Sequence, residues 1–165
     1  MLPASPLLLA QLLCLLLLAN GLPILMRYLL GPVGAVAVDG GRHRADGTPW
    51  LGASKTWRGL LAAILGTGLT AGLMGLPVAV GFDLGLWAML GDLSSSFIKR
   101  RLHLASGARA TGLDQLPEAV LPLLAVRDEL GVSMPMVGLL ALLFLLLDIA
   151  LSRWLYSWHI RERPY

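Results

Sequence analysis

Long apolar runs separated by short polar stretches dominate the chain. Since a membrane-spanning helix needs about 20 mostly apolar residues, each long run is a candidate span. The shortest run contains Pro117 and Pro122 and is the least regular of the set. The pattern predicts five transmembrane helices, at about residues 7–30, 59–80, 82–98, 114–126 and 134–154.

The composition agrees with this pattern. Hydrophobic residues make up 56% of the 165 residues and charged residues 14%, with a mean hydropathy of +0.74. These values predict an all-α integral membrane protein, with residues 1–165 forming a single membrane-embedded domain. The single cysteine, Cys14, excludes a disulfide framework, a multi-cysteine zinc site and an iron–sulfur cluster. A net charge of +3 is too small to indicate nucleic acid as a partner.

The first apolar run is also a candidate signal peptide. A secretory signal has a positive segment before a short apolar region, whereas here no Lys or Arg precedes Arg27 and the run is long. The pattern therefore favours an uncleaved first helix.

Positive residues predict how the helices are oriented. Cytoplasmic segments carry the excess of Lys and Arg, and here the positive residues gather in alternate connections. The two remaining connections, near 75–83 and 127–133, contain only Arg127. Five crossings therefore place the N-terminus outside, the C-terminus in the cytoplasm, and the active site on cytoplasmic loops and helix ends of a multi-pass protein in the cell (inner) membrane. The residues on the cytoplasmic side are Arg42, Arg44, Lys55, Arg58, Lys99, Arg100, Arg101, Arg109, Arg153, Arg161 and Arg163.

One polar stripe lies at the end of the third predicted helix. Asp92, Ser95, Ser96 and Lys99 share one helical face, which leads toward the basic loop. Ionisable groups in spanning helices are costly, so each is a functional candidate. A carboxylate, hydroxyls and a cation on one face suit a metal-bound phosphate. The alternative is that Asp92 pairs with Lys99 or a neighbouring helix and only fixes packing.

Further carboxylates follow in the fourth and fifth predicted helices. Asp114 and Glu118 are four residues apart and share a face, and Mg²⁺ commonly binds one or two carboxylates together with phosphate oxygens and water. Asp92 and Asp114 could supply these ligands from adjoining helices. Asp114 is also a candidate N-terminal cap, and the two roles are compatible. For Glu118 the sequence does not decide between a functional and a structural role. Asp148, deep in the last helix, is predicted to make a polar contact between helices.

The basic segments have alternative interpretations too. Lys99, Arg100 and Arg101 could anchor a helix at lipid headgroups. The stretch 52–58 resembles a phosphate cradle but is not a Walker loop, because Ala53 and Ser54 separate Gly52 from Lys55. The three histidines share no metal-ligand spacing and receive no role.

Several strings in sequence order carry a specific resemblance. They are residues 39–41, 51–59, 90–101, Gly107 and 113–116. Together they resemble the CDP-archaeol synthase family, which is similar to the phosphatidate cytidylyltransferases. The resemblance implies a five-helix membrane enzyme that transfers CMP from CTP to a lipid phosphate with Mg²⁺ and releases pyrophosphate.

The resemblance also implies roles for individual residues. By the resemblance, Asp92 and Asp114 match the carboxylates that bind the metal. Together with Lys99 they form the predicted catalytic group. The remaining predicted residues would contact the CTP phosphates: Asp39, Lys55, Thr56, Arg58, Ser96, Arg100 and Arg101. The predicted partners are CTP, the bilayer and a lipid phosphate, either phosphatidate-like or an isoprenoid glycerol phosphate. The oligomeric state stays open between monomer and homodimer.

Reaction chemistry agrees with this class independently. The lipid phosphate is itself the nucleophile, so the site needs cations to neutralise two charged reactants and requires no Ser–His pair. CDP-alcohol phosphotransferases are excluded by spacing, because Asp39-Gly40 is followed by a single further Asp46. The remaining alternative is a small transporter or scaffold whose intramembrane Asp residues carry protons or join helices.

Overall fold

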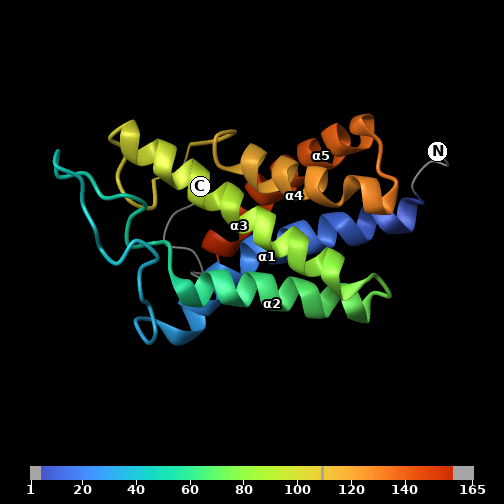
Figure 1. The fold of residues 1–165 in the computed structure, drawn as a ribbon, viewed down its shortest axis with the longest axis horizontal. Helices are drawn as coiled ribbons and strands as arrows, with labels where there is room; N and C mark the ends of the chain where they lie inside the picture. Colours follow the sequence, from blue (N-terminus) through green and yellow to red (C-terminus); the bar gives the residue numbers. More distant parts are fainter. Residues whose placement is uncertain (1–4, 109, 158–165) are drawn as a thin grey trace.

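The structure is a computed structural model that describes residues 5–108 and 110–157. Within these ranges the chain forms five helices and no named strand: α1 (Pro6–Leu30), α2 (Trp57–Leu73), α3 (Val78–Arg101), α4 (Gln115–Leu130) and α5 (Met134–Ser157). The helices pack side by side as one bundle, and the loop between α1 and α2 lies at the same end as the C-terminal end of α3 (Figure 1). The fold is all-α, as the sequence predicts. Arg109, His159, Arg161 and Arg163 lie outside the described residues.

The predicted boundary between the second and third helices is wrong. The run assigned to 59–80 ends as α2 at Leu73, and α3 begins at Val78 rather than at 82. Gly75 has φ +79°, in the left-handed region that favours glycine, and Pro77 stands at the N-cap of α3. A proline near a helix start tolerates its missing N–H, so these residues form a turn inside an unbroken apolar run.

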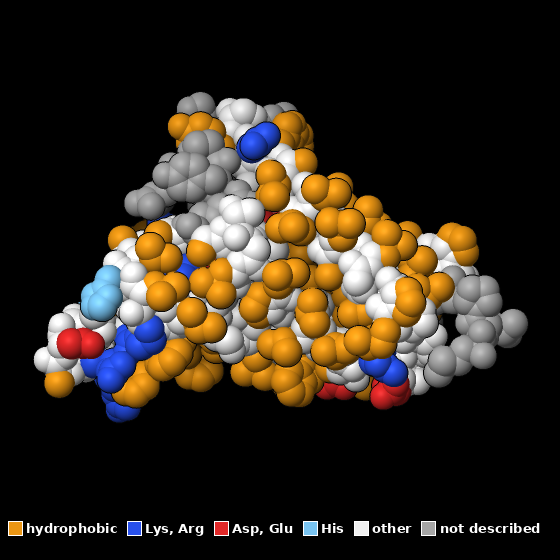
Figure 2. All heavy atoms as spheres, turned by 90° about the horizontal axis from the view of Figure 1, so that it is seen from above, with side chains coloured by type: hydrophobic (Ala, Val, Ile, Leu, Met, Phe, Trp, Pro, Cys, Tyr) orange, Lys and Arg blue, Asp and Glu red, His pale blue; other side chains and the backbone are white. Residues whose placement is uncertain are grey.

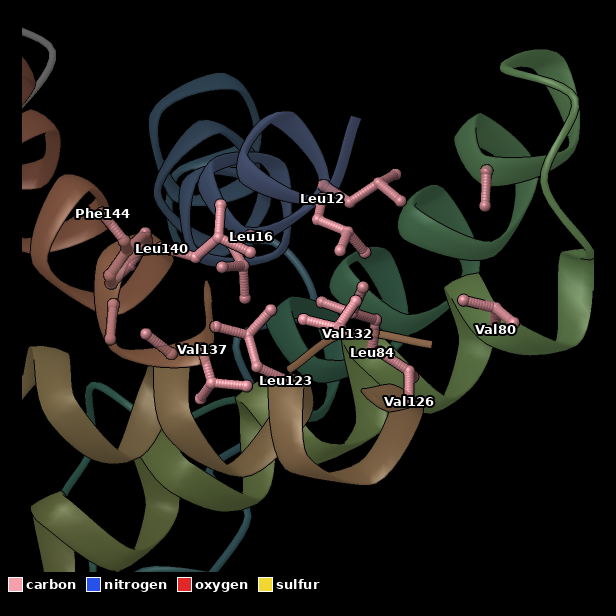
Figure 3. Close-up of a cluster of buried hydrophobic side chains, with 14 residues drawn as sticks. Leu12, Leu16, Val80, Leu84, Leu123, Val126, Val132, Val137, Leu140 and Phe144 are labelled. Atoms are coloured by element: carbon pink, nitrogen blue, oxygen red, sulfur yellow. The ribbon is translucent and has the colours of Figure 1, made fainter. Parts of the chain in front are cut away.

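The core includes Ala63 and Ala71 of α2, and its largest side chains lie between α1, α3, α4 and α5. Leu16, Leu84, Leu123 and Phe144 are fully buried there, one from each helix (Figure 3). α2 packs on α3 through glycines: a Cβ added to Gly85 would lie 2.9 Å from the Cα of Ile64. Such close backbone approach is typical of helices that associate in membranes. It holds α2 closely against α3.

The surface fits a bilayer environment. α1 and the segment Met134–Trp154 of α5 are long and apolar enough to cross a membrane, and α2 is a shorter apolar helix. Hydrophobic side chains cover most of the face in Figure 2, and a group of Lys and Arg side chains lies at one end of it.

Candidate functional site

Lys55 and Asp92 form an ion pair between the α1–α2 loop and α3. The Lys55 Nζ lies 2.6 Å from Asp92 Oδ1 and 2.7 Å from Oδ2. Lys55 directly precedes Thr56, the N-cap of α2, and Asp92 lies within α3, so the α2–α3 packing brings them together. Burial acts to lower the pKa of Lys55, but the adjacent Asp92 carboxylate outweighs it and raises that pKa above its ordinary value. Lys55 is therefore a fixed cation at neutral pH.

Lys99 and Asp114 form a second pair between α3 and the loop before α4. Their Nζ and Oδ1 atoms are 2.6 Å apart, and Lys99 also donates to the carbonyl of Ala108 at 3.0 Å. Asp114 stands at the N-cap of α4 but makes no capping hydrogen bond, so the cap alternative is wrong. Its Oδ2 accepts from the backbone N–H of Ala110 at 2.9 Å instead. The carboxylate thus orders the loop that precedes it.

Glu118, whose role the sequence left undecided, lies next to the Lys55–Asp92 pair. Its carboxyl lies within hydrogen-bonding reach of the Asp92 carboxyl. The contact depends on Gly91, because a Cβ there would lie 2.5 Å from the carbonyl carbon of Pro117 and 2.8 Å from the Glu118 nitrogen. Glycine therefore lets α3 and α4 approach at the point where the two carboxyls meet.

The four paired residues and Glu118 form one charged cluster, which we call the lysine–carboxylate cluster. Three carboxyls face two lysines, so the fully ionised cluster carries one net negative charge. Asp92 and Asp114, the predicted metal ligands, each contact a different lysine. In the described part of the chain, no set of three or more His, Cys, Asp or Glu residues has a metal-binding arrangement.

Arg100 lies beside the cluster with unused donors. Its side chain is 3% exposed, yet its Nε and one terminal nitrogen have no hydrogen-bond partner among the described residues. That terminal nitrogen would lie 3.6 Å from a Cβ at Gly52, and Asp114 is close enough to act on Arg100 electrostatically. Buried guanidinium groups are nearly always hydrogen-bonded, so this geometry suits an anion supplied from outside the chain.

Arg101 joins the end of α3 to the preceding loop. It donates to the carbonyl of Pro49 at 2.8 Å and to Thr48 Oγ1 at 3.2 Å, and its guanidinium carbon lies 5.0 Å from the ring centroid of Phe97. Its Nε and second terminal nitrogen are buried without a partner in the residues described. Arg101 therefore has both a structural contact and spare donors.

Two other predicted phosphate contacts have local partners. Arg58 donates to the carbonyls of Gly31 and Val33, and Thr56 Oγ1 accepts from the Gly59 N–H as the cap of α2. Ser96 is buried within α3. In this structure Arg58 thus ties the end of α1 to the start of α2.

Asp39 shapes the loop that contains Lys55. Its carboxylate accepts from the backbone N–H groups of Gly41, Leu51 and Gly52 at 2.9–3.0 Å. Although burial acts to raise the pKa of Asp39, these backbone hydrogen bonds lower it below its ordinary value. The carboxylate stays ionised at neutral pH and orients the turn that leads to Lys55.

Comparisons with known proteins agree with the resemblance. A family model described as CDP-archaeol synthase, CarS-like, matches residues 7–165. A CDP-archaeol synthase of Hyperthermus butylicus is 43% identical over 104 residues, which are 59% of this chain and 59% of that protein. One from Sulfurisphaera tokodaii is 47% identical over 85 residues, 48% of this chain and 51% of that protein. The chain thus aligns with about three-fifths or less of these relatives' lengths.

A solved structure, described as an intramembrane enzyme for archaeal membrane lipid biosynthesis, has the same fold. It superposes with a TM-score of 0.67 at 32% identity, covering 84% of this chain and 90% of that one. With the apolar helices, this likeness identifies a membrane protein. Because the family model spans nearly all of the sequence, this chain belongs to the CarS-like CDP-archaeol synthase family.

Proposed function

We propose that this protein is an enzyme that transfers CMP from CTP to a lipid phosphate in the membrane, making a CDP-lipid. An oxygen of the lipid phosphate attacks the α-phosphorus of CTP. The bond from that phosphorus to the oxygen bridging to the β-phosphate breaks, and pyrophosphate leaves. The observation that carries the proposal is Arg100, buried at the cluster with donors that lack a partner among the residues that the structure describes. A scaffold, or a transporter whose Asp residues carry protons, does not require such donors.

The cationic side chains would contact the phosphate groups of the reactants in two ways. Arg100 and Arg101 have spare donors for the triphosphate, and Lys55 and Lys99 can exchange their carboxylate partners for phosphate oxygens. Neutralising the phosphates lets two anionic reactants approach and stabilises the leaving pyrophosphate.

The carboxyls fit a divalent cation. Asp92 and Glu118 face one another, and two adjacent carboxylates need a proton or a cation between them. Asp92 and Asp114 remain the predicted Mg²⁺ ligands, with Glu118 as a further candidate. Bound there, Mg²⁺ would supply Lewis-acid stabilisation of phosphate charge.

The lipid chains have an apolar groove beside the site. An open groove of about 390 Å³ is lined by Leu51 and by Leu90, Leu93 and Phe97 of α3. It adjoins the loop that holds Lys55. The relatives' names support an isoprenoid (archaeol-type) glycerol phosphate as the substrate.

A direct assay tests the activity. Purified protein with CTP, Mg²⁺ and an archaeol-type glycerol phosphate in detergent micelles should release pyrophosphate and form a CDP-lipid detectable by mass spectrometry. Phosphatidate in a parallel reaction distinguishes ester from ether substrates. If neither lipid supports pyrophosphate release, the proposed activity is contradicted.

The lysines are expected to act on CTP. Lys55→Ala and Lys99→Ala should raise the Michaelis constant for CTP or lower turnover by about tenfold or more, since a charge-assisted hydrogen bond in a buried site contributes a few kcal/mol. Arg58→Ala is expected to have a smaller effect, because both terminal nitrogens of Arg58 already donate to backbone carbonyls. Arg127, paired with Asp128 at the end of α4, offers the control Arg127→Ala. CTP kinetics unchanged in both lysine variants would remove these residues from the nucleotide site.

We also propose five crossings of the cell (inner) membrane with the N-terminus outside. This topology places the lysine–carboxylate cluster on the cytoplasmic side, where CTP is available. A reporter fused after Tyr165 should read cytoplasmic, and one inserted at Gly75 should read external. A periplasmic reading at the C-terminus would contradict the five-helix topology.

A further inference from the structure

Asp148 of α5 is connected to the loop that holds Asp114. The side-chain amide of Gln115 donates from Nε2 to Asp148 Oδ2 at 2.9 Å, and the Oε1 of the same amide accepts from the backbone N–H of Gly112 at 2.9 Å. Gln115 is 3% exposed. This contact confirms that Asp148 joins helices, and it continues beyond the helices into the loop backbone.

The direction of these hydrogen bonds gives Asp148 a specific task. Asp148 Oδ2 accepts the hydrogen bond from Gln115, whereas an amide can present either its NH₂ or its oxygen to a neighbour. Asp148 therefore turns the NH₂ of Gln115 toward α5 and leaves the amide oxygen for Gly112. With the amide reversed, its NH₂ would face the Gly112 N–H, and both donors would lose their acceptors.

The hydrogen bonds from Asp148 through Gln115, which we call the Asp148 brace, reach the site at Gly112. Its φ of +87° lies in the left-handed region, so the chain turns there just before Asp114. Asp114 in turn accepts from Ala110 and pairs with Lys99. Two side-chain contacts thus fix the 110–115 turn: Asp114 and Gln115, at its C-terminal end, accept from the backbone N–H groups of Ala110 and Gly112.

We propose that Asp148 is a positioning residue for Asp114, acting through Gln115 and the Gly112 turn. The effect on catalysis rests on the function proposed above, in which Asp114 serves the reaction. Packing alone does not explain the residue, because a leucine would pack in this apolar helix without the cost of a carboxylate in a membrane.

Hydrogen–deuterium exchange of the full-length protein in detergent tests the brace without any assay of activity. In Gln115→Leu, exchange in the peptide containing residues 110–116 should be faster by about tenfold or more, because Gly112 loses its acceptor. In Asp148→Leu exchange in the same peptide should also be faster, because the Gln115 amide that provides this acceptor is no longer held in place by its hydrogen bond to α5. Asn20 and Asp148 both line a small cavity of about 20 Å³ between α1 and α5. The Asn20 amide, however, donates to the carbonyl of Leu16 in its own helix. Asn20→Leu is therefore the matched control and should leave this peptide protected. Unchanged exchange in Asp148→Leu would overturn the proposal.

Kinetics test the consequence at the site. Asp148→Leu should lower kcat by about tenfold and change the Michaelis constant for CTP by less than about threefold, because a misplaced site group slows the chemical step. Asp148→Asn keeps an acceptor oxygen and should restore kcat to within about threefold of the parent. The double variant Asp148→Leu/Gln115→Leu should be no slower than the slower single variant, since both act through one connection.

Multiplicative kinetic losses in the double variant, or failure of Asp148→Asn to restore kcat, would contradict the connection. If the parent protein itself shows no CTP-dependent turnover, the proposed function fails, while the exchange experiment still decides whether Asp148 positions the turn.

Discussion

Replacing Asp92 with asparagine is expected to reduce turnover about a thousandfold while the protein still inserts and purifies. The amide keeps the shape of the side chain but loses the charge that faces Lys55 at 2.6 Å and that would bind Mg²⁺. Losing one metal carboxylate costs several kcal/mol of transition-state stabilisation, which corresponds to that factor in rate. Initial rates at saturating CTP and lipid phosphate measure the effect.

Asp83 provides the control for this substitution. It is an exposed carboxylate near the start of the same helix, far from the lysine–carboxylate cluster in sequence. Asp83→Asn should therefore keep turnover within about twofold of the parent, as surface substitutions usually do. A loss in Asp92→Asn no larger than in this control would reduce Asp92 to a packing role.

Replacing Gly91 with alanine is expected to lower turnover about a hundredfold. The added methyl group would lie 2.5 Å from the carbonyl carbon of Pro117, and backbone atoms cannot move aside as a flexible side chain can. α3 and α4 must then separate, which parts Asp92 from Glu118, and misplacement of a reacting group by about 1 Å costs roughly that factor. Thermal unfolding of the purified variant, followed alongside the rate, measures how far the loss of close packing also lowers Tm.

Gly138 is the matched control for Gly91. It also lies within a helix, but a Cβ there would meet nothing within 4 Å. Gly138→Ala should leave turnover unchanged and raise helix stability slightly, because alanine is favoured over glycine in helices by about 1 kcal/mol. Equal activity of the two alanine variants would show that α3 and α4 need not approach closely for catalysis.

Much of the fold was predictable because apolar run length carries most of the signal in a membrane protein. The first and last helices were predicted to within a few residues, because α1 and α5 are long, leucine-rich and mostly apolar. The break between α2 and α3 was not predicted correctly. Leucine and valine surround Gly75 and Pro77, so the mean hydropathy stays high across the turn. There the glycine and proline were the better signal.

The candidate site was predictable in its residue types but not in its pairing. A helical face brings Asp92 and Lys99 together in the sequence pattern, yet each pairs with a residue from another segment. Glu118 approaches Asp92 because Gly91 has no side chain to keep the backbone of Pro117 away. This contact joins two different helices, so no local periodicity in the sequence predicts it. Likewise, nothing in the sequence around Arg58 indicates that its guanidinium contacts the end of α1.

The two lysine–carboxylate pairs also bear on how the protein assembles in the bilayer. An isolated charge near hydrocarbon is costly, so Asp92 in α3 would favour a shallower position until it pairs with Lys55, which precedes it in the chain. Once both pairs have formed, four of the charges at this end of the bundle are compensated internally. We therefore expect the chain to supply its own counter-ions during insertion, before any nucleotide or lipid binds.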